Sequence, residues 1–276
     1  MAATGLLDRL IPGDHVCLVF DDEPLRTRSV AGYIRAGLRD HHRILYRGPG
    51  SDRVVAELTA QGVDVRPALD RDQLRFGGAY LRGGVFDPEA TYQSWRDEVR
   101  RTAAAGYRGM RAIGDMSWAR HQGDDLLRYE ARVNRIFAEG YAMGVCLYDR
   151  RLFNGGRLRR VTGTHPTTVT RQTDPRTVPL LRAVRTGDPP GIRLEGEADL
   201  SNREALSEVF GQLAEDAAAT LTVDVSSLRF ADAASVRLLL RITDGGRHRL
   251  RLKGCSHALR RLLAFHGAGA AVEFLP

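Results

Sequence analysis

One histidine and two cysteines in this sequence could bind a metal ion or respond to oxidation. His15 and Cys17 stand two residues apart in the apolar segment HVCLVF, so in a strand both would face the same side of the sheet. If the strand that carries Cys146 lay beside it, the imidazole and thiol groups would form a cluster. Buried thiols and a hydrogen-bonded histidine explain the same pattern. We favour this plainer interpretation, so no metal site is predicted.

A second group of polar and aromatic residues stands at or just past the ends of predicted strands. Together with His15 and Cys17, these residues could line a ligand pocket with an aromatic wall. The group consists of Asp115, Trp118, Tyr148 and Asp149. Capping of strand ends explains the same placement equally well.

The segment LTVDVSSLRFADAASVRLLL (221–240) has the pattern of a buried strand, a short loop and an apolar helix. Asp232 can cap that helix, and a phosphate two residues later would add about two negative charges at its positive end. The residue at that place is Ala234, which cannot be phosphorylated. Ser235 follows it, turned by about 100° around the helix.

The first strand-to-helix turn, FDDEPLRTRS, lacks the glycines and the lysine of a phosphate-binding loop. Its three acids, Asp21, Asp22 and Glu23, would repel a phosphate. Asp115 alone cannot hold a magnesium nucleotide. We therefore expect no nucleotide hydrolysis, and the protein is not predicted to be an enzyme or to need a cofactor.

Composition narrows the class of protein further. The net charge is +7, but the arginines alternate with acids, as in SWRDEVRR, so we expect solvated helix faces and no nucleic-acid partner. No apolar stretch is long enough to span a membrane, and the N-terminal residues do not resemble a signal peptide. Three widely spaced cysteines do not indicate a disulfide framework. A cytoplasmic protein without a membrane partner is expected.

Strand-like and helix-like segments alternate through residues 15–149, which predicts an α/β fold with a mostly parallel sheet. Residues 154–190 are rich in Thr, Arg, Gly and Pro and end in GDPPG, a linker pattern. The alternation then restarts and continues to the C-terminus. We therefore predict a domain at 1–170, a linker at 171–190 and a small β/α domain at 191–276.

The first domain resembles the MEDS family, the sensory domain of DcmR-type regulators. The resemblance rests on GDHVCLVFDD, GDMSWA, LLRYEARVN, CLYD and THP, in that order. It implies a degenerate RecA/KaiC-like fold of three layers. It also implies a ligand-sensing module, proposed for small hydrocarbon derivatives, rather than a catalyst.

The second domain resembles the STAS family, the fold of bacterial anti-sigma factor antagonists. LEGEADLSN (194–202) and VDVSSLRFADAASVRLLL (223–240) carry the resemblance, in which Asp224, Ser226, Phe230 and Asp232 match the family signature. The family's regulatory phosphoserine falls on Ala234. The resemblance implies binding to an anti-sigma factor that is a histidine-kinase-like ATPase.

These features together predict a signalling regulator that acts as an anti-sigma factor antagonist, with a sensor for an unidentified small ligand and without the usual phosphoacceptor. The expected partner-binding residues are Phe230, Asp232, Ala233, Ala234, Ser235 and Arg237. Three interpretations of the second domain stay open: a form locked for binding, a shift of phosphorylation to Ser235, or a module for interaction or dimerisation only. The rival hypothesis is a metal- or thiol-based sensor whose second domain is such a module. The sequence leaves the oligomeric state open.

Overall fold

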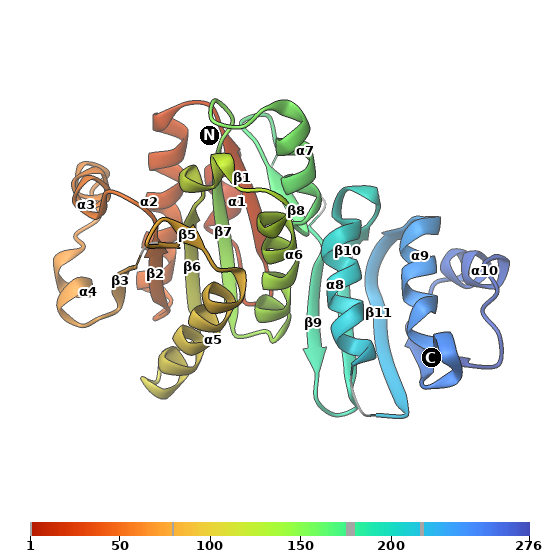
Figure 1. The fold of residues 1–276 in the computed structure, drawn as a ribbon. Helices are drawn as coiled ribbons and strands as arrows, with labels where there is room; N and C mark the ends of the chain where they lie inside the picture. The colour runs from red at the N-terminus through yellow and green to blue at the C-terminus, as the bar shows by residue number, and fades with distance from the viewer. Residues whose placement is uncertain (1, 79, 175–179, 216–217) are drawn as a thin grey trace.

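The computed structural model describes residues 2–78, 80–174, 180–215 and 218–276, which form two α/β domains (Figure 1). The first domain is built on a six-stranded sheet in which all neighbouring strands are parallel. The strands, in spatial order, are β3 (Leu74–Gly77), β2 (Arg43–Arg47), β6 (Met110–Asp115), β7 (Ala142–Asp149), β1 (His15–Phe20) and β8 (Thr167–Val169). All residues of β1, β2 and β6 are buried, as expected for a parallel sheet covered on both faces.

Helices cover the two faces of this sheet, so the domain has the three layers that the sequence predicts. Val16, Leu18 and Phe20 pack into one apolar core, and Cys17 and Val19 point into the other. The first core lies under α1 (Ala2–Leu7), α2 (Glu23–Arg39), α3 (Ser51–Ala60) and α4 (Arg66–Asp70). The second lies under the hairpin β4 (Leu81–Arg82) and β5 (Val85–Phe86), and under α5 (Pro88–Ala104), η1 (Ser117–His121), α6 (Asp124–Ala138) and α7 (Gly155–Gly163).

The second domain has a five-stranded sheet with its own apolar core. Its strands, in spatial order, are β13 (Val272–Leu275), β12 (Arg249–Lys253), β11 (Thr220–Ala231), β10 (Gly191–Ala198) and β9 (Arg182–Thr186). Only β9 is antiparallel to its neighbour. The helices are η2 (Leu200–Asn202), α8 (Arg203–Ala214), α9 (Ala233–Leu240), η3 (Arg241–Gly246) and α10 (His257–Phe265).

Two segments differ from the sequence-based expectation. The predicted linker 171–190 contains β9, which pairs with β10 and belongs to the second sheet; residues 175–179 of that linker lie outside the described residues. A strand of five residues in an Arg- and Pro-rich stretch has no strong local pattern, and only its long-range partner reveals it. In addition, β11 continues to Ala231, where a loop was expected, because it stays paired with β10.

The two domains contact each other along α6 and α8, which lie side by side in Figure 1. Arg135 of α6 forms ion pairs with Glu208 (3.0 Å) and Glu215 (3.0 Å). Arg182 of β9 pairs with both carboxylate oxygens of Asp14, at 2.8 and 2.9 Å, and Asp14 is buried. A bidentate ion pair of this kind fixes the orientation of both groups.

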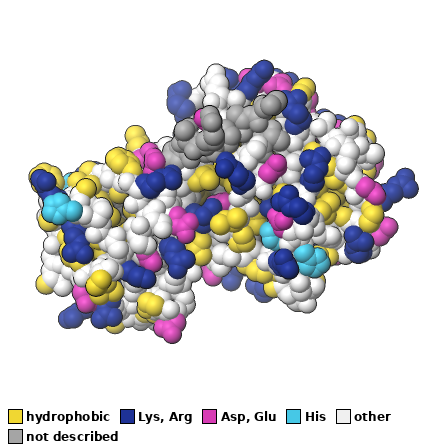
Figure 2. Space-filling model, turned by 180° about the vertical axis from the view of Figure 1, so that it is seen from behind, with side chains coloured by type: hydrophobic (Ala, Val, Ile, Leu, Met, Phe, Trp, Pro, Cys, Tyr) yellow, Lys and Arg dark blue, Asp and Glu magenta, His cyan; other side chains and the backbone are white. Residues whose placement is uncertain are grey.

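Charge is mixed over the surface rather than concentrated. On the face shown in Figure 2, Lys and Arg side chains are scattered among Asp and Glu side chains. None of the described helices is both long and apolar enough to cross a membrane.

Asp224 of β11 offers a test of the second domain's stability. Burial tends to raise the pKa of the Asp224 carboxyl, but hydrogen bonds from the Ser226 hydroxyl and amide, with Lys253 and Arg193 nearby, outweigh burial and lower the pKa. A lowered folded-state pKa stabilises the fold above the unfolded pKa, and this contribution is lost as the pH falls through the folded value. We expect Asp224→Asn to lower the Tm at pH 7 by about 2–4 °C.

This difference in Tm should shrink below about pH 4, where the wild-type carboxylate also becomes neutral. Thermal melts from pH 3.5 to 7.5, with the exposed Ser227→Ala as control, measure it. A difference that stays constant down to the lowest pH would contradict the assignment.

Candidate functional site

Four side chains from separate parts of the first domain meet at one point beside the sheet. They are His15 of β1, Glu130 of α6, Cys146 of β7 and His165 of the turn before β8, and their ligand atoms all lie within 4.8 Å of one another. Glu130, His15 and His165 are at most 1% exposed. A buried set of imidazole, thiol and carboxylate groups is of the kind that binds transition metals.

The hydrogen bonds around the two histidines leave one nitrogen of each ring directed to this point. The amide nitrogen of Asn134 donates to three backbone carbonyls, so its oxygen accepts from His15 Nδ1 at 2.8 Å. His165 Nδ1 lies 2.9 Å from the carbonyl of Val161, which can only accept. In a neutral ring, Nε2 of each histidine therefore carries a lone pair, the form that binds metals.

Three of the distances between the four groups match those around a tetrahedral metal ion. Bond lengths of about 2.0–2.3 Å around zinc place neighbouring ligand atoms about 3.3–3.6 Å apart. Cys146 Sγ lies 3.4 Å from His15 Nε2 and 3.6 Å from Glu130 Oε2. His165 Nε2 lies 3.3 Å from Glu130 Oε2 yet makes no aligned hydrogen bond, as expected if both atoms face a shared centre.

The charges of the cluster also suit a divalent cation. Burial, reinforced by His165, lowers the pKa of His15 to about 3, so the ring is neutral. Burial raises the pKa of the Glu130 carboxyl, but His165 and the 2.7 Å hydrogen bond from the Tyr148 hydroxyl outweigh burial and lower it. A Glu130 carboxylate and a Cys146 thiolate with two neutral imidazoles would balance a charge of +2, which reduces the cost of burying the ion.

An apolar cavity of about 20 Å³ adjoins the cluster, with His15 and Cys146 in its wall. Trp95, Tyr129 and Phe137 form the other side. Space of this size accepts roughly one water-sized group. The cavity therefore has room for about one water-sized group beside an ion held by the cluster.

The residues that the sequence suggested for a ligand pocket do not form one site. His15 belongs to the cluster, and the Tyr148 hydroxyl donates a hydrogen bond to Glu130 of the cluster. Cys17 lies opposite Cys146 on the neighbouring strand but outside the four-residue group. Asp115 accepts hydrogen bonds from the Tyr46 hydroxyl and the Ser117 amide. Trp118 lines an apolar pocket of about 590 Å³. Asp149 forms an ion pair with Arg151.

Sequence reasoning missed Glu130, Asn134 and His165. All three stand in segments quoted above, LLRYEARVN and THP, which drew attention for family resemblance and not for chemistry. Glu130 and Asn134 are four residues apart and so share one face of α6, a spacing that could have indicated a polar site in an otherwise apolar helix face. The strand of Cys146 does lie beside that of His15 and Cys17, which is the condition that the sequence left open for a cluster.

The segment around α9 presents several of the expected partner-binding residues. Asp232 caps α9 by accepting a hydrogen bond from the Ser235 amide at 2.7 Å, as predicted. Phe230 is 51% exposed and Arg237 is exposed, while Ala233 and Ala234 are half-buried at the start of the helix. Ser235 is only 3% exposed, and its hydroxyl has no hydrogen-bond partner. A kinase would reach Ser235 only after a local opening.

Comparison with known proteins assigns both domains. Residues 14–166 match the family model of the methanogen/methylotroph DcmR sensory domain, MEDS, and the chain belongs to this family. Residues 181–275 match a STAS domain model. The protein is thus a MEDS sensory domain followed by a STAS domain, in the predicted order. No curated protein matches the chain.

Two solved structures are similar to part of the chain. One is the flagellar accessory protein FlaH from Methanocaldococcus jannaschii, at 12% identity and a TM-score of 0.41 over 60% of this chain and 74% of that chain. The other is a KaiC-like protein from Pyrococcus horikoshii, at 11% identity and a TM-score of 0.43 over 67% of this chain and 79% of that chain. Both scores are below 0.5, and the fold described above rests on the chain's own sheet topology.

The cluster predicts binding of one zinc ion by the MEDS domain. We expect Cys146→Ser to weaken zinc affinity by at least about 100-fold, since loss of a ligand exceeds the 10–100-fold typical of residues that only orient ligands. Asn134→Ala, which frees the His15 ring, should fall within that 10–100-fold range. Competition with a chromophoric chelator measures both affinities.

Cys255→Ser is the matched control for zinc binding, because Cys255 is a buried free thiol of the other domain. Its affinity for zinc should equal that of the wild type. Equal zinc binding by Cys146→Ser and Cys255→Ser would show that the four-residue cluster is not a metal site.

Proposed function

We propose that this protein is a cytoplasmic signalling regulator of the anti-sigma factor antagonist class, which acts by binding and not by catalysis. In this proposal the STAS domain binds a histidine-kinase-like ATPase that restrains a sigma factor. The match to the STAS domain and the exposed Phe230 beside the α9 N-terminus support it. Ala234 at the phosphoserine position, with Ser235 buried, supports control by the sensory domain rather than by phosphorylation.

The observation that carries the sensing role is the convergence of His15, Glu130, Cys146 and His165 in a domain of a sensory family. The same observation favours a second candidate function, a metal-based sensor. In that case a metal ion at the cluster, or a small ligand that reaches it through the adjoining cavity, is the signal. The two candidates differ in the output partner and share the sensing site.

Three contacts connect the cluster to the STAS domain through neighbouring residues. Glu130 and Asn134 share α6 with Arg135, which pairs with Glu208 of α8. His15 follows Asp14, the partner of Arg182. His165 precedes Pro166, whose carbonyl accepts a hydrogen bond from Asn202 at 3.4 Å. Asn202 ends η2, four residues after Ala198, and the Ala198 carbonyl accepts a hydrogen bond from the Asp232 amide at 3.0 Å. A change at the cluster can thus reach the α9 surface within few contacts.

The partner surface predicts a selective effect of Phe230. We expect Phe230→Ala to weaken binding of the anti-sigma factor by at least about tenfold, because exposed aromatic anchors contribute most to interfaces. The matched control is Phe265→Ala, since Phe265 is the other exposed phenylalanine of the domain, on α10. It should stay within about twofold of the wild type.

Affinity purification with the full chain, read by mass spectrometry, identifies an ATPase of this class, and titration of the purified pair gives the affinities. Recovery of no such ATPase would contradict the antagonist proposal. Equal loss of affinity in both phenylalanine variants would contradict the placement of the surface at α9.

The domain contact predicts that Arg135 transmits the state of the cluster. If zinc changes the affinity of the chain for its partner, Arg135→Met should reduce that zinc-dependent ratio to within about twofold, because coupling needs a contact that differs between the two states. Arg132→Met is the control, since Arg132 lies on the same helix but pairs with Glu89 inside the MEDS domain. An unchanged ratio in Arg135→Met would show that α6 and α8 do not carry the signal.

A further inference from the structure

One buried arginine of the MEDS domain has no anionic partner among the residues that the structure describes. Arg47 ends β2 and is 7% exposed. The other three arginines that are buried in the described part of the chain, Arg26, Arg43 and Arg111, each lie beside a carboxylate. No described Asp or Glu forms an ion pair with Arg47. A buried charge without a counter-charge is costly and needs an explanation.

Neutral groups hold the Arg47 guanidinium in place. Its Nη1 donates to Ser94 Oγ at 2.9 Å, and the Ser94 hydroxyl donates in turn to the Thr91 carbonyl at 2.7 Å. The guanidinium carbon lies 4.2 Å from the centre of the Trp95 ring and 5.5 Å from that of Tyr80. These contacts orient the group and leave its charge uncompensated.

Two nitrogens on one edge of the guanidinium make no hydrogen bond to a described residue. Nε is buried without a hydrogen-bond partner, and no hydrogen bond joins Nη2 to a described residue. The Nε and Nη2 hydrogens together form the edge that a carboxylate takes with both of its oxygens.

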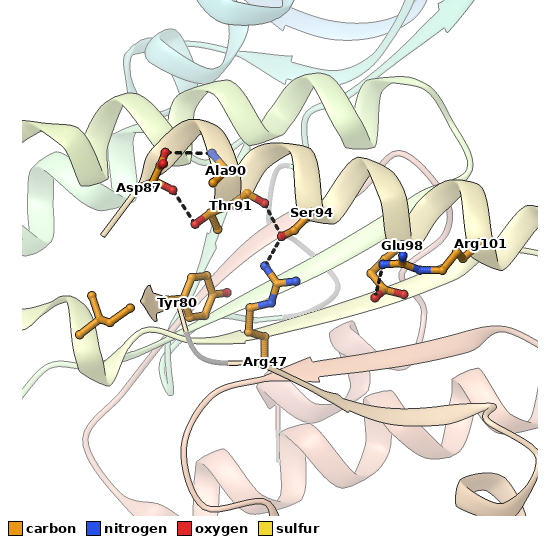
Figure 3. A pocket seen from close by; sticks show the side chains of 10 residues that line it. Arg47, Tyr80, Asp87, Ala90, Thr91, Ser94, Glu98 and Arg101 are labelled. Carbon is orange, nitrogen blue, oxygen red and sulfur yellow. Dashed lines mark hydrogen bonds and ion pairs between the residues drawn. The ribbon is translucent and has the colours of Figure 1, made fainter. Parts of the chain in front are cut away.

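Arg47 lines a pocket of about 350 Å³ between the end of β2 and helix α5 (Figure 3). In this view its side chain rises from the strand toward Ser94, with Tyr80 on one side and the Glu98–Arg101 pair on the other. Glu98 is matched by Arg101 at 2.7 Å and by Arg75 at 3.7 Å. Asp87 caps α5 by accepting from the Ala90 amide at 2.9 Å. Both acidic side chains of the pocket therefore already have partners. Arg47 has no counter-charge among the described residues of the pocket.

We propose that this pocket binds a small organic carboxylate. Its two oxygens accept hydrogen bonds from Nε and Nη2 of Arg47, and its apolar body lies against Tyr80 and Leu81. A planar guanidinium with one free edge suits a carboxylate, whereas a phosphate dianion would call for a second unmatched cation. The carboxyl end of β2 is also the edge of a parallel sheet where ligands bind. The site is separate from the four-residue cluster and independent of the proposed function.

Calorimetric titration of the full chain with benzoate, acetate and the neutral analogue benzamide tests the charge requirement. We expect saturable binding of benzoate, and at least about tenfold weaker binding of benzamide, because benzamide cannot supply the anion. Equal affinity for benzoate and benzamide, or no saturable binding of either carboxylate below about 10 mM, would overturn the proposal. Stronger competition against benzoate by inorganic phosphate than by acetate would also overturn it, in favour of a phosphate site.

Substitution of Arg47 separates a binding role from a structural one. Arg47→Met should weaken benzoate binding by at least about tenfold, while its Tm stays equal to that of the wild type or rises, because an unmatched buried charge is removed. Arg100→Met, which alters an exposed arginine of α5, should leave binding within about twofold. Unchanged binding in Arg47→Met, or a lowered Tm, would contradict the proposal.

Two further variants keep the result interpretable. Arg47→Lys retains the positive charge but lacks the two parallel N–H donors of the guanidinium. Its affinity for benzoate should therefore fall between those of the wild type and Arg47→Met. Cys146→Ser removes a candidate metal ligand and should bind benzoate as the wild type does. Loss of benzoate binding in Cys146→Ser would show that the two sites are not separate. If the protein binds benzoate but does not bind zinc, the metal site is wrong and the carboxylate site is still supported.

Discussion

The buried carboxylate of Glu130 is the constraint on which the arrangement of the sensory domain depends. A carboxylate with no exposure to water needs partners on every side, and it takes them from Tyr148, Cys146 and His165. Those partners come from β7 and from the turn before β8, so satisfying one charge fixes α6 against the sheet. The same group would provide the negative charge for a metal ion, which joins stability and sensing in one place.

Helix α6 therefore serves both domains. One of its faces holds Glu130 and Asn134 at the cluster, and the adjoining face carries Arg135 to the STAS domain. A helix that is rigidly packed cannot adjust on one face without moving the other, because its side chains are close-packed on both. The short route from His165 through Pro166 to Asn202 reaches the same end of the STAS sheet as Asp232. In the proposed function, these contacts let the sensory domain control the STAS surface in place of a phosphorylated serine.

Two buried charged residues in one layer of the MEDS domain, Glu130 and Arg47, differ in the partners around them. Glu130 is enclosed by partners, whereas Arg47 lines a pocket and its Nε has no hydrogen-bond partner among the described residues. The aromatic side chains of Trp95 and Tyr80 separate them: both line the small cavity beside Cys146, and both lie against the Arg47 guanidinium. The polar cluster and the Arg47 pocket thus lie on opposite sides of an aromatic wall. If both proposals hold, the MEDS domain binds a metal ion on one side and a carboxylate on the other.

The sequence by itself determined the two domains, their order and most of their elements. Alternating apolar segments and capped helices are local patterns, and the cap at Asp232 lies where the sequence placed it. Local pattern could not show that β9 belongs to the STAS sheet, that Phe230 is exposed, or that Ser235 is buried, since each depends on what packs against it.

Local sequence patterns also could not show that the four side chains of the cluster meet at one point. His15, Glu130, Cys146 and His165 are spread over 151 residues of chain, from position 15 to position 165. Only the parallel order of β7, β1 and β8, with α6 across them, brings the four together, because ligand geometry is set by tertiary packing and not by spacing in the sequence.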